Sequence, residues 1–126
     1  MQVDFYKKKF GREGEETAAK FLKEQGFTIL ERNYRCRLGE IDLIASRDNE
    51  FFFIEVKSRH SFQEVAPEEL ISYSKQRHIS RVAQHYVSKK KIWSQTGRFA
   101  LVVIDASSGP VRCELINDIF ELNWGY

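Results

Sequence analysis

The chain has 126 residues, of which 42% are hydrophobic and 30% are charged, and its formal net charge at neutral pH is +2. Its 10 Phe, 5 Tyr and 2 Trp exclude the aromatic-poor composition of a disordered chain. A chain of this length buries roughly two-thirds of its unfolded surface on folding, which supports one core. We therefore expect a single folded domain that spans residues 1–126.

No run approaches the 18 or so apolar residues that a membrane-spanning helix needs. The first nine residues include four charged ones but lead into no apolar segment of the kind found in secretory signals. These features predict a soluble, cytoplasmic protein with no membrane partner. Cys36 and Cys113 are single and far apart, which indicates neither a disulfide framework nor a zinc motif.

Acidic and basic residues are segregated along the chain. Residues 38–69 contain three basic and eight acidic residues, a sum of −5, whereas residues 70–104 contain seven basic residues and no acidic one. Such an arrangement suits a protein that holds a cation with one region and a polyanion with another. A solvated helix face explains any single Lys or Arg, but the length of the acid-free stretch favours a nucleic-acid partner.

The first expected element is a helix over residues 11–25, ended by Gly26, which suits the left-handed position after a helix. Its apolar stripe contains Ala18, Ala19 and Leu22. Glu15 precedes these residues by three, four and seven positions, so it lies on the core-facing side and needs a partner. The alternative is an acid of the first helical turn, favoured by the helix dipole.

Three strands are expected next, over residues 27–34, 40–45 and 51–57, and Asp48-Asn49 turns the last two into a hairpin. Period-two alternation in the third strand places three apolar residues on one face, namely Phe52, Ile54 and Val56. The other face carries Phe51, Phe53, Glu55 and Lys57. In the second strand the same alternation separates Ile41, Leu43 and Ala45 from Glu40, Asp42 and Ile44.

The hairpin register determines which side chains face each other. A turn that is symmetric about Asp48-Asn49 pairs positions whose numbers sum to 97, so Asp42 lies opposite Glu55 and Glu40 opposite Lys57. Opposed side chains stand roughly 5 Å apart at Cβ, and two carboxylates at that distance repel unless a positive charge lies between them. A bulge would shift this register by one residue.

The remaining elements are a helical region over residues 67–90, a strand over 98–105, a turn at 107–110 and a strand over 111–117. Ser72-Tyr73-Ser74 could divide the helical region in two. His78 and His85 are expected at the surface or the core edge, because no acid or Cys shares their turns. The order α-β-β-β-α-β-β predicts an α/β fold with a mixed sheet flanked by helices.

Asp42 and Glu55 together are candidate ligands for Mg²⁺ or Mn²⁺, because hard divalent cations take carboxylate oxygens. Val56 would add its backbone carbonyl as a further ligand. Lys57 lies on the same side of the strand as Glu55, where an ammonium can orient a water or stabilise charge on a phosphate. The alternative is an ordinary edge hairpin in which Glu40 pairs with Lys57 while Asp42 and Glu55 reach solvent.

At these residues the sequence resembles a known motif. Asp42 followed by Glu55-Val56-Lys57 is similar to the PD-(D/E)xK nuclease motif, with Ile41 in place of its usual Pro. Residues 11–19, 31–37, 39–45, 53–59 and 75–77 resemble the bacterial YraN-like family, which is similar to archaeal Holliday junction resolvases. This resemblance implies a restriction-endonuclease-like fold with Asp42 and Glu55 as Mg²⁺ ligands, Lys57 as catalytic lysine and Glu15 as an additional acidic metal and site residue.

The resemblance implies a metal-dependent nuclease that hydrolyses phosphodiester bonds in DNA, with branched or junction DNA as one substrate class. A junction-cutting enzyme would be expected to form a homodimer, so that two sites act symmetrically. Charge and position indicate the residues expected to contact DNA, which are Lys75, Gln76, Arg59, Arg77 and Arg81. Two alternatives are a nucleic-acid-binding module that keeps the fold without turnover, and a structural protein whose stability does not respond to metal.

Overall fold

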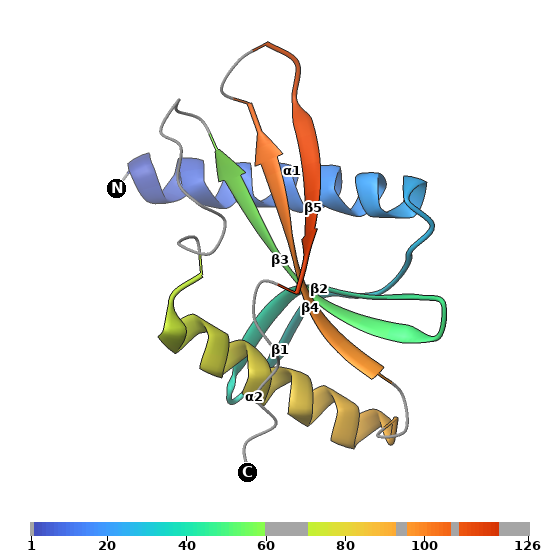
Figure 1. The fold of residues 1–126 in the computed structure, drawn as a ribbon. Helices are drawn as coiled ribbons and strands as arrows, with labels where there is room; N and C mark the ends of the chain where they lie inside the picture. The colour runs from blue at the N-terminus through green and yellow to red at the C-terminus, as the bar shows by residue number, and fades with distance from the viewer. Residues whose placement is uncertain (1, 60–70, 93–95, 107–108, 119–126) are drawn as a thin grey trace.

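The computed structural model describes residues 2–59, 71–92, 96–106 and 109–118, with side chains from residue 12 to residue 58 in the first of these ranges. It contains two helices and five strands in the predicted order (Figure 1): α1 (Gln2–Glu24), β1 (Thr28–Cys36), β2 (Gly39–Arg47), β3 (Glu50–Arg59), α2 (Tyr73–Lys90), β4 (Thr96–Asp105) and β5 (Arg112–Asn117). The strands form one sheet in the order β1-β2-β3-β4-β5. All neighbouring pairs are antiparallel except β3 and β4, which are parallel. The expected mixed α/β fold is therefore confirmed.

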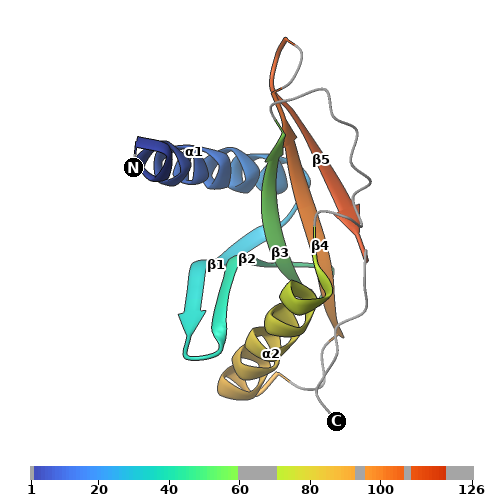
Figure 2. The ribbon, with the colours of Figure 1, turned by 90° about the vertical axis from the view of Figure 1, so that its left-hand side faces the viewer.

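The two helices pack on opposite faces of the sheet, because their buried residues belong to two different clusters. In Figure 2, α1 lies beside the upper part of the sheet and α2 beside its lower part. Ala18 and Leu22 of α1 share a buried cluster with Phe52 and Ile54 of β3. Residues of α2 occupy a second cluster with Phe53 of β3 and alternate residues of β4, and these α2 residues are Ile79, Val82, Ala83 and Tyr86. The predicted alternation of β3 is confirmed, because its even-numbered residues face α1 and Phe53 faces α2.

Helix α1 is longer than the sequence predicts. It begins at Gln2 rather than near residue 11, and the side chains of residues 2–11 lie outside the described part of the chain. Its end is as predicted, since Gly26 has a φ of 92° and the Phe27 N–H donates to the Leu22 carbonyl at 3.0 Å. The expected apolar stripe is buried, with Leu22 fully inaccessible.

The β2–β3 hairpin has the predicted register. Leu43 lies opposite Ile54 and Arg47 opposite Glu50, and these pairs sum to 97. Asp48 and Asn49 have φ values of 53° and 64°, the left-handed conformations of a type I′ turn, whose twist matches that of the two strands. The neighbouring β1–β2 pair is less regular, because its register shifts between Ile29 and Glu31.

Helix α2 begins at Tyr73 because Ser72 caps it, with the Lys75 N–H donating to the Ser72 hydroxyl at 3.1 Å. The helical segment expected over residues 67–70 lies outside the described residues, as do residues 107 and 108 of the expected turn. His78 is exposed and His85 is half-buried, as predicted. Neither of the described helices is apolar enough to cross a membrane.

Gly39 joins β1 to β2 under strong local constraint, and replacing it with alanine should destabilise the fold. Its φ of 140° is outside the range that side chains tolerate, and a Cβ would lie 3.3 Å from Val82 of α2. We expect Gly39→Ala to lower the free energy of unfolding by roughly 2–3 kcal/mol, measured by urea denaturation. Gly109→Ala is the control, because Gly109 has a φ of 70° but no described atom within 4 Å of the added Cβ, and should cost about 1 kcal/mol. Equal losses would contradict the contact with α2.

Candidate active site

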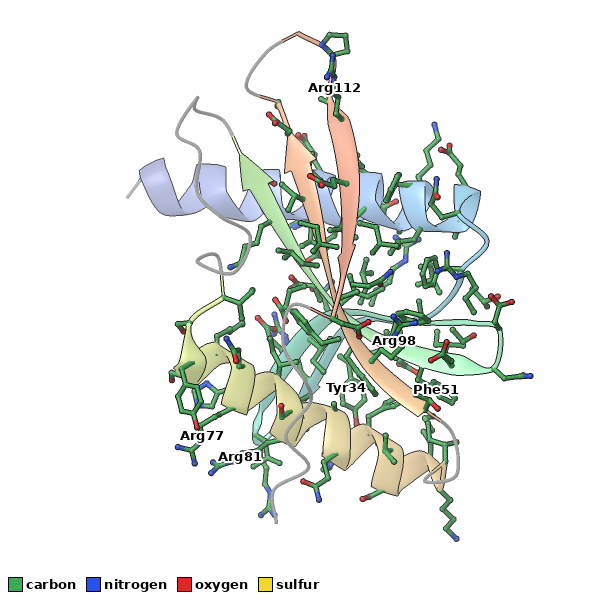
Figure 3. The ribbon with its side chains drawn as sticks, in the orientation of Figure 1. Tyr34, Phe51, Arg77, Arg81, Arg98 and Arg112 are labelled. Carbon is green, nitrogen blue, oxygen red and sulfur yellow. The ribbon has the colours of Figure 1, made fainter. Side chains whose placement is uncertain are left out.

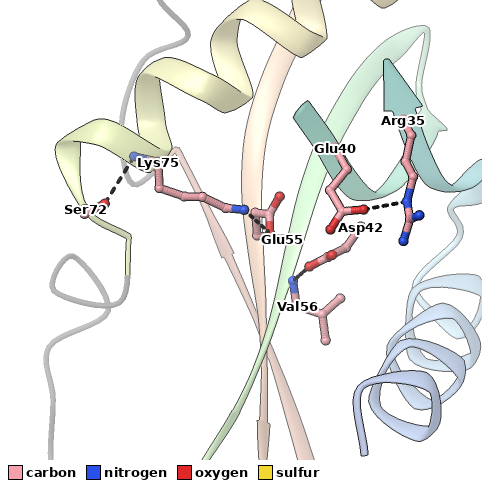
Figure 4. A network of polar contacts seen from close by, with 7 residues as sticks. All are labelled: Arg35, Glu40, Asp42, Glu55, Val56, Ser72 and Lys75. Atoms are coloured by element: carbon pink, nitrogen blue, oxygen red, sulfur yellow. Dashed lines mark hydrogen bonds and ion pairs between the residues drawn. The ribbon is translucent and has the colours of Figure 1, made fainter. Parts of the chain in front are cut away.

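The site forms where β2 separates from β3. Backbone pairing between these strands ends at Leu43 and Ile54, and the next residue on each strand is acidic, Asp42 and Glu55. The Asp42 carboxylate accepts a hydrogen bond from the Val56 N–H at 2.8 Å (Figure 4). The Asp42 side chain thus takes the place of a backbone carbonyl as the partner of the Val56 N–H. This hydrogen bond fixes the Asp42 carboxylate beside β3.

The separation changes the orientation of β2. Alternation predicts Ile41 on the same face as Leu43 and Ala45, and this is wrong. Leu43 and Ala45 pack in the cluster on the α1 side, whereas Ile41 joins Ile44 in the cluster on the α2 side. The physical reason is that β2 leaves the regular pleat at Asp42, where the ladder with β3 has ended.

Glu55 is buried, with 3% of its surface exposed. Its Oε2 lies 3.9 Å from the Lys75 ammonium of α2, and its Oε1 is buried with no hydrogen-bond partner in the described part of the chain. Burial raises the pKa of Glu55 to about 9, and the neighbouring Asp42 carboxyl group adds to this rise. Lys75 and Lys57 oppose it. The site therefore lacks enough positive charge to ionise both carboxyl groups at neutral pH.

Glu15 approaches the same region from α1. The Asn33 side chain donates a hydrogen bond to its carboxylate at 2.9 Å. Burial raises the pKa of Glu15, the Asn33 hydrogen bond lowers it, and the nearby Asp42 and Glu40 raise it. Because α1 begins at Gln2, Glu15 lies in the middle of the helix, and the alternative of a first-turn acid is wrong.

Asn33 is the partner that sequence reasoning did not identify for Glu15. It has a φ of 52° within a strand, a conformation that Asn tolerates better than most residues. The feature of the sequence that could have pointed to this role is an Asn that stands between a polar and an aromatic residue in a strand. Its pairing with Glu15 could not be read from the chain, because it depends on how α1 crosses β1.

Glu40 does not belong to the acidic pair. Its carboxylate accepts a hydrogen bond from the Arg35 guanidinium at 2.8 Å, within the β1–β2 hairpin (Figure 4). The edge-hairpin alternative is therefore wrong, since Glu40 pairs with Arg35, Glu55 is buried and β3 is an interior strand.

The structure brings together part of the predicted metal site. Asp42 and Glu55 lie side by side, and Lys57 is close enough to lower the pKa of Glu55. No group of three or more His, Cys, Asp or Glu side chains arranged to hold a metal occurs among the described residues, so Glu15 is not gathered with this pair. The described contact of Val56 uses its N–H, and metal binding by its carbonyl stays a prediction.

The residues predicted to contact DNA differ in orientation. Lys75 turns inward to Glu55, and the Gln76 side chain donates to the Ile71 carbonyl at 3.2 Å. Arg77 and Arg81 are exposed on α2. Arg59 ends β3, and its side chain lies outside the described residues. DNA binding by these five residues stays a prediction.

Comparison with known proteins shows the family of the chain. The model of the uncharacterised protein family UPF0102 matches residues 14–104. The chain belongs to the UPF0102 family. The matched range includes Glu15, Asp42, Glu55 and Lys57, and the predicted membership of the YraN-like family is confirmed.

UPF0102 proteins of three bacteria illustrate the similarity. The protein of Caldicellulosiruptor saccharolyticus is 45% identical over 117 residues, which cover 93% of each chain. That of Syntrophus aciditrophicus is 43% identical over 115 residues, which cover 91% of each chain. That of Clostridium perfringens is 40% identical over 119 residues, which cover 93% of this chain and 98% of the relative.

Glu55→Gln should make the protein more stable at alkaline pH. The pKa of Glu55 is about 9 in the folded state and roughly 4.3 in the unfolded state. The folded state therefore keeps a proton that the unfolded state loses, so wild-type stability falls as pH rises between these values. We expect the variant to melt several degrees above wild type at pH 8, at about 4 °C per kcal/mol for a chain of this size, and to match it near pH 4.

The control for this measurement is Glu40→Gln. Glu40 is an ion-paired carboxylate with 47% of its side chain exposed, so its replacement should bring no gain that grows with pH. Thermal denaturation of the three proteins from pH 4 to pH 9 provides the comparison. A difference between Glu55→Gln and wild type that does not change with pH would contradict the buried, proton-holding state of Glu55.

Proposed function

We propose that this protein is a metal-dependent nuclease that hydrolyses phosphodiester bonds in DNA at a site formed by Asp42, Glu55 and Lys57. The observation that carries the proposal is the buried Glu55 carboxyl beside Asp42, with one oxygen that has no partner in the described part of the chain. The similarity of Asp42 and Glu55-Val56-Lys57 to the PD-(D/E)xK motif supports it.

The residues present fit a hard divalent cation. Two carboxyl groups share the site, the charge of Asp42 helps to raise the pKa of Glu55, and a Glu55 oxygen is unpartnered. Asp42 and Glu55 would hold Mg²⁺ or Mn²⁺, with the Val56 carbonyl as a further ligand and Glu15 acting directly or through water. A bound divalent ion supplies Lewis-acid chemistry, which activates water and neutralises phosphate charge.

The chain's own groups have separate roles. The Val56 N–H holds the Asp42 carboxylate in one orientation. Lys57, close to Glu55, supplies an ammonium that stabilises negative charge developing on the phosphate or orients the attacking water. Lys75 of α2, 3.9 Å from Glu55, supports the ionised state of that carboxyl. The buried acid is costly for stability, which is typical of groups retained for function.

A non-catalytic nucleic-acid-binding module is the second candidate. The absence of acidic residues from α2 supports nucleic-acid binding in either case. Two carboxyl groups facing each other would weaken phosphate binding rather than aid it, so they favour the nuclease. The similarity of the YraN-like family to Holliday junction resolvases supports branched or junction DNA as substrate, and with it a homodimer.

A cleavage assay tests the proposal. Wild type is expected to cut labelled four-way-junction, flap or linear DNA with Mg²⁺ or Mn²⁺ and not with EDTA, leaving 5′-phosphate and 3′-hydroxyl ends. Asp42→Asn and Lys57→Ala should each reduce the rate about 100-fold or more, the usual loss when a group that stabilises the transition state is removed. Glu40→Gln is the matched control, because this neighbouring carboxylate pairs with Arg35 and should leave cleavage unchanged.

One result would replace this proposal with the second candidate. If wild type binds these DNAs but does not cut them with either metal, and Asp42→Asn binds them equally well, the protein is a binding module.

A further inference from the structure

The outward face of α2 carries a pocket that the acidic site does not use. It has a volume of about 210 Å³ and is lined by Tyr73, Ser74, Arg77, His78 and Arg81. Tyr73, Arg77 and Arg81 are spaced four residues apart, so they form one row along the helix with about 6 Å between neighbours. Figure 3 shows Arg77 and Arg81 extending from α2 away from the sheet.

The pocket is positively charged, and its charge is not balanced by its own helix. Helix α2 contains no acidic residue, and Arg77 and Arg81 are like charges four positions apart, which repel each other. Neither guanidinium forms an ion pair within the described part of the chain, whereas Lys75 on the same helix turns to Glu55. An anion bound between the two arginines would relieve this repulsion.

Tyr73 adds an aromatic surface beside the arginines. It is 71% exposed, more than any other large hydrophobic residue that the structure describes as exposed. A tyrosine with a packing role would be largely buried, as Tyr86 is on the same helix at 4%. An exposed ring next to cationic groups is typical of sites where nucleic-acid bases stack while their phosphates are bound.

We infer that this pocket binds an unpaired nucleotide of a single-stranded nucleic acid, with the base stacked on Tyr73 and the phosphates held by Arg77 and Arg81. Ser74 and His78 supply hydrogen bonds to the same nucleotide. Bases inside a duplex are already stacked on each other, so a strand must be unpaired to use the Tyr73 ring. The inference rests on the proposed function in that the ligand is a nucleic acid, and it specifies a substrate with a single-stranded segment.

The position of the pocket relates this segment to the acidic pair. Lys75, two residues after Tyr73, points to Glu55 on the inner side of α2, while the pocket opens on the outer side (Figures 3 and 4). Lys75 and the Tyr73 end of the pocket therefore lie on the first turn of α2. A strand in the pocket would leave its duplex near the beginning of this helix, as in a flap or branched substrate.

Binding measurements without metal test this inference. Fluorescence anisotropy would compare a labelled single-stranded oligonucleotide with a duplex of equal length, using Asp42→Asn protein in EDTA so that no DNA is cut. Arg77→Gln/Arg81→Gln should weaken single-strand binding at least tenfold and reduce the slope of log K against log salt by about 1.4, the value for two lost phosphate contacts. Lys89→Gln/Lys90→Gln is the matched control, because it removes two charges from the other end of the same helix and should have a clearly smaller effect.

Substitutions of Tyr73 distinguish recognition of a base from simple attraction between charges. Tyr73→Ala should weaken single-strand binding about tenfold, the usual loss of one stacked base, and leave binding of the duplex and of heparin unchanged. Tyr73→Phe should bind as wild type does. Melting temperatures close to that of wild type would show that these outward-facing substitutions leave the fold intact.

Other outcomes would overturn the inference. If the lysine control loses as much affinity as the arginine variant, or if Tyr73→Ala affects duplex and heparin equally or affects nothing, the pocket is a general cationic surface. Failure of the nuclease proposal gives a different result: wild type would not cleave DNA with either metal, but the differences in single-strand binding among the variants would remain. If wild type cleaves DNA but the Arg77/Arg81 and Tyr73 variants bind single strands as wild type does, only the inference about the pocket is overturned.

Discussion

The insufficient positive charge around the carboxyl groups of Asp42 and Glu55 is the constraint on which the rest of this structure depends. Glu55 is held in an interior strand between apolar residues, and it cannot turn to solvent. Burial raises its pKa to about 9, with a further rise from Asp42, and only the Lys75 ammonium at 3.9 Å and the charge of Lys57 oppose this rise. A divalent cation would satisfy both carboxyl groups at once.

The topology of the sheet produces this arrangement. Strand β3 must continue beside β4, its parallel partner, whereas β2 follows β1 into the Gly39 turn, so the β2–β3 ladder ends at Leu43 and Ile54. The first residues beyond the ladder are the two acids, and the Asp42 carboxylate reaches β3 by accepting the Val56 N–H. Helix α2 then adds Lys75 beside Glu55, whereas Glu15 of α1 lies near enough to Asp42 for the charge of Asp42 to raise the pKa of Glu15.

Much of this could be predicted from the sequence, because it depends on local rules. The Asp48-Asn49 turn determines the hairpin register, and alternation in β3 determines which of its residues face each helix. The order of the elements, the buried face of α1 and its end at Gly26 also follow from short-range patterns. The same turn puts Asp42 and Glu55 one residue beyond Leu43 and Ile54, where the ladder ends.

The remaining contacts depend on how distant elements dock, which no short-range pattern encodes. Ile41 changes face because β2 leaves the pleat, Asn33 reaches Glu15 because α1 crosses β1, and Lys75 reaches Glu55 because α2 packs on the sheet. Alternation assumes a regular strand, and it failed at the position where the strand stops being regular. That position is the candidate site itself, which accords with the general finding that local rules are broken at functional sites.

Direct titration of the Glu55 carboxyl by NMR, with carbon-13 in the Glu side chains and Glu55→Gln used to assign its signal, would show whether this buried carboxyl is protonated at neutral pH. Without metal, we expect this carboxyl to hold its proton at neutral pH and to titrate at about pH 9. Added Mg²⁺ should ionise it at neutral pH in wild type and not in Asp42→Asn. An ordinary titration between pH 4 and 5 that Mg²⁺ does not alter would contradict both the protonated state of Glu55 and its role in holding a metal ion.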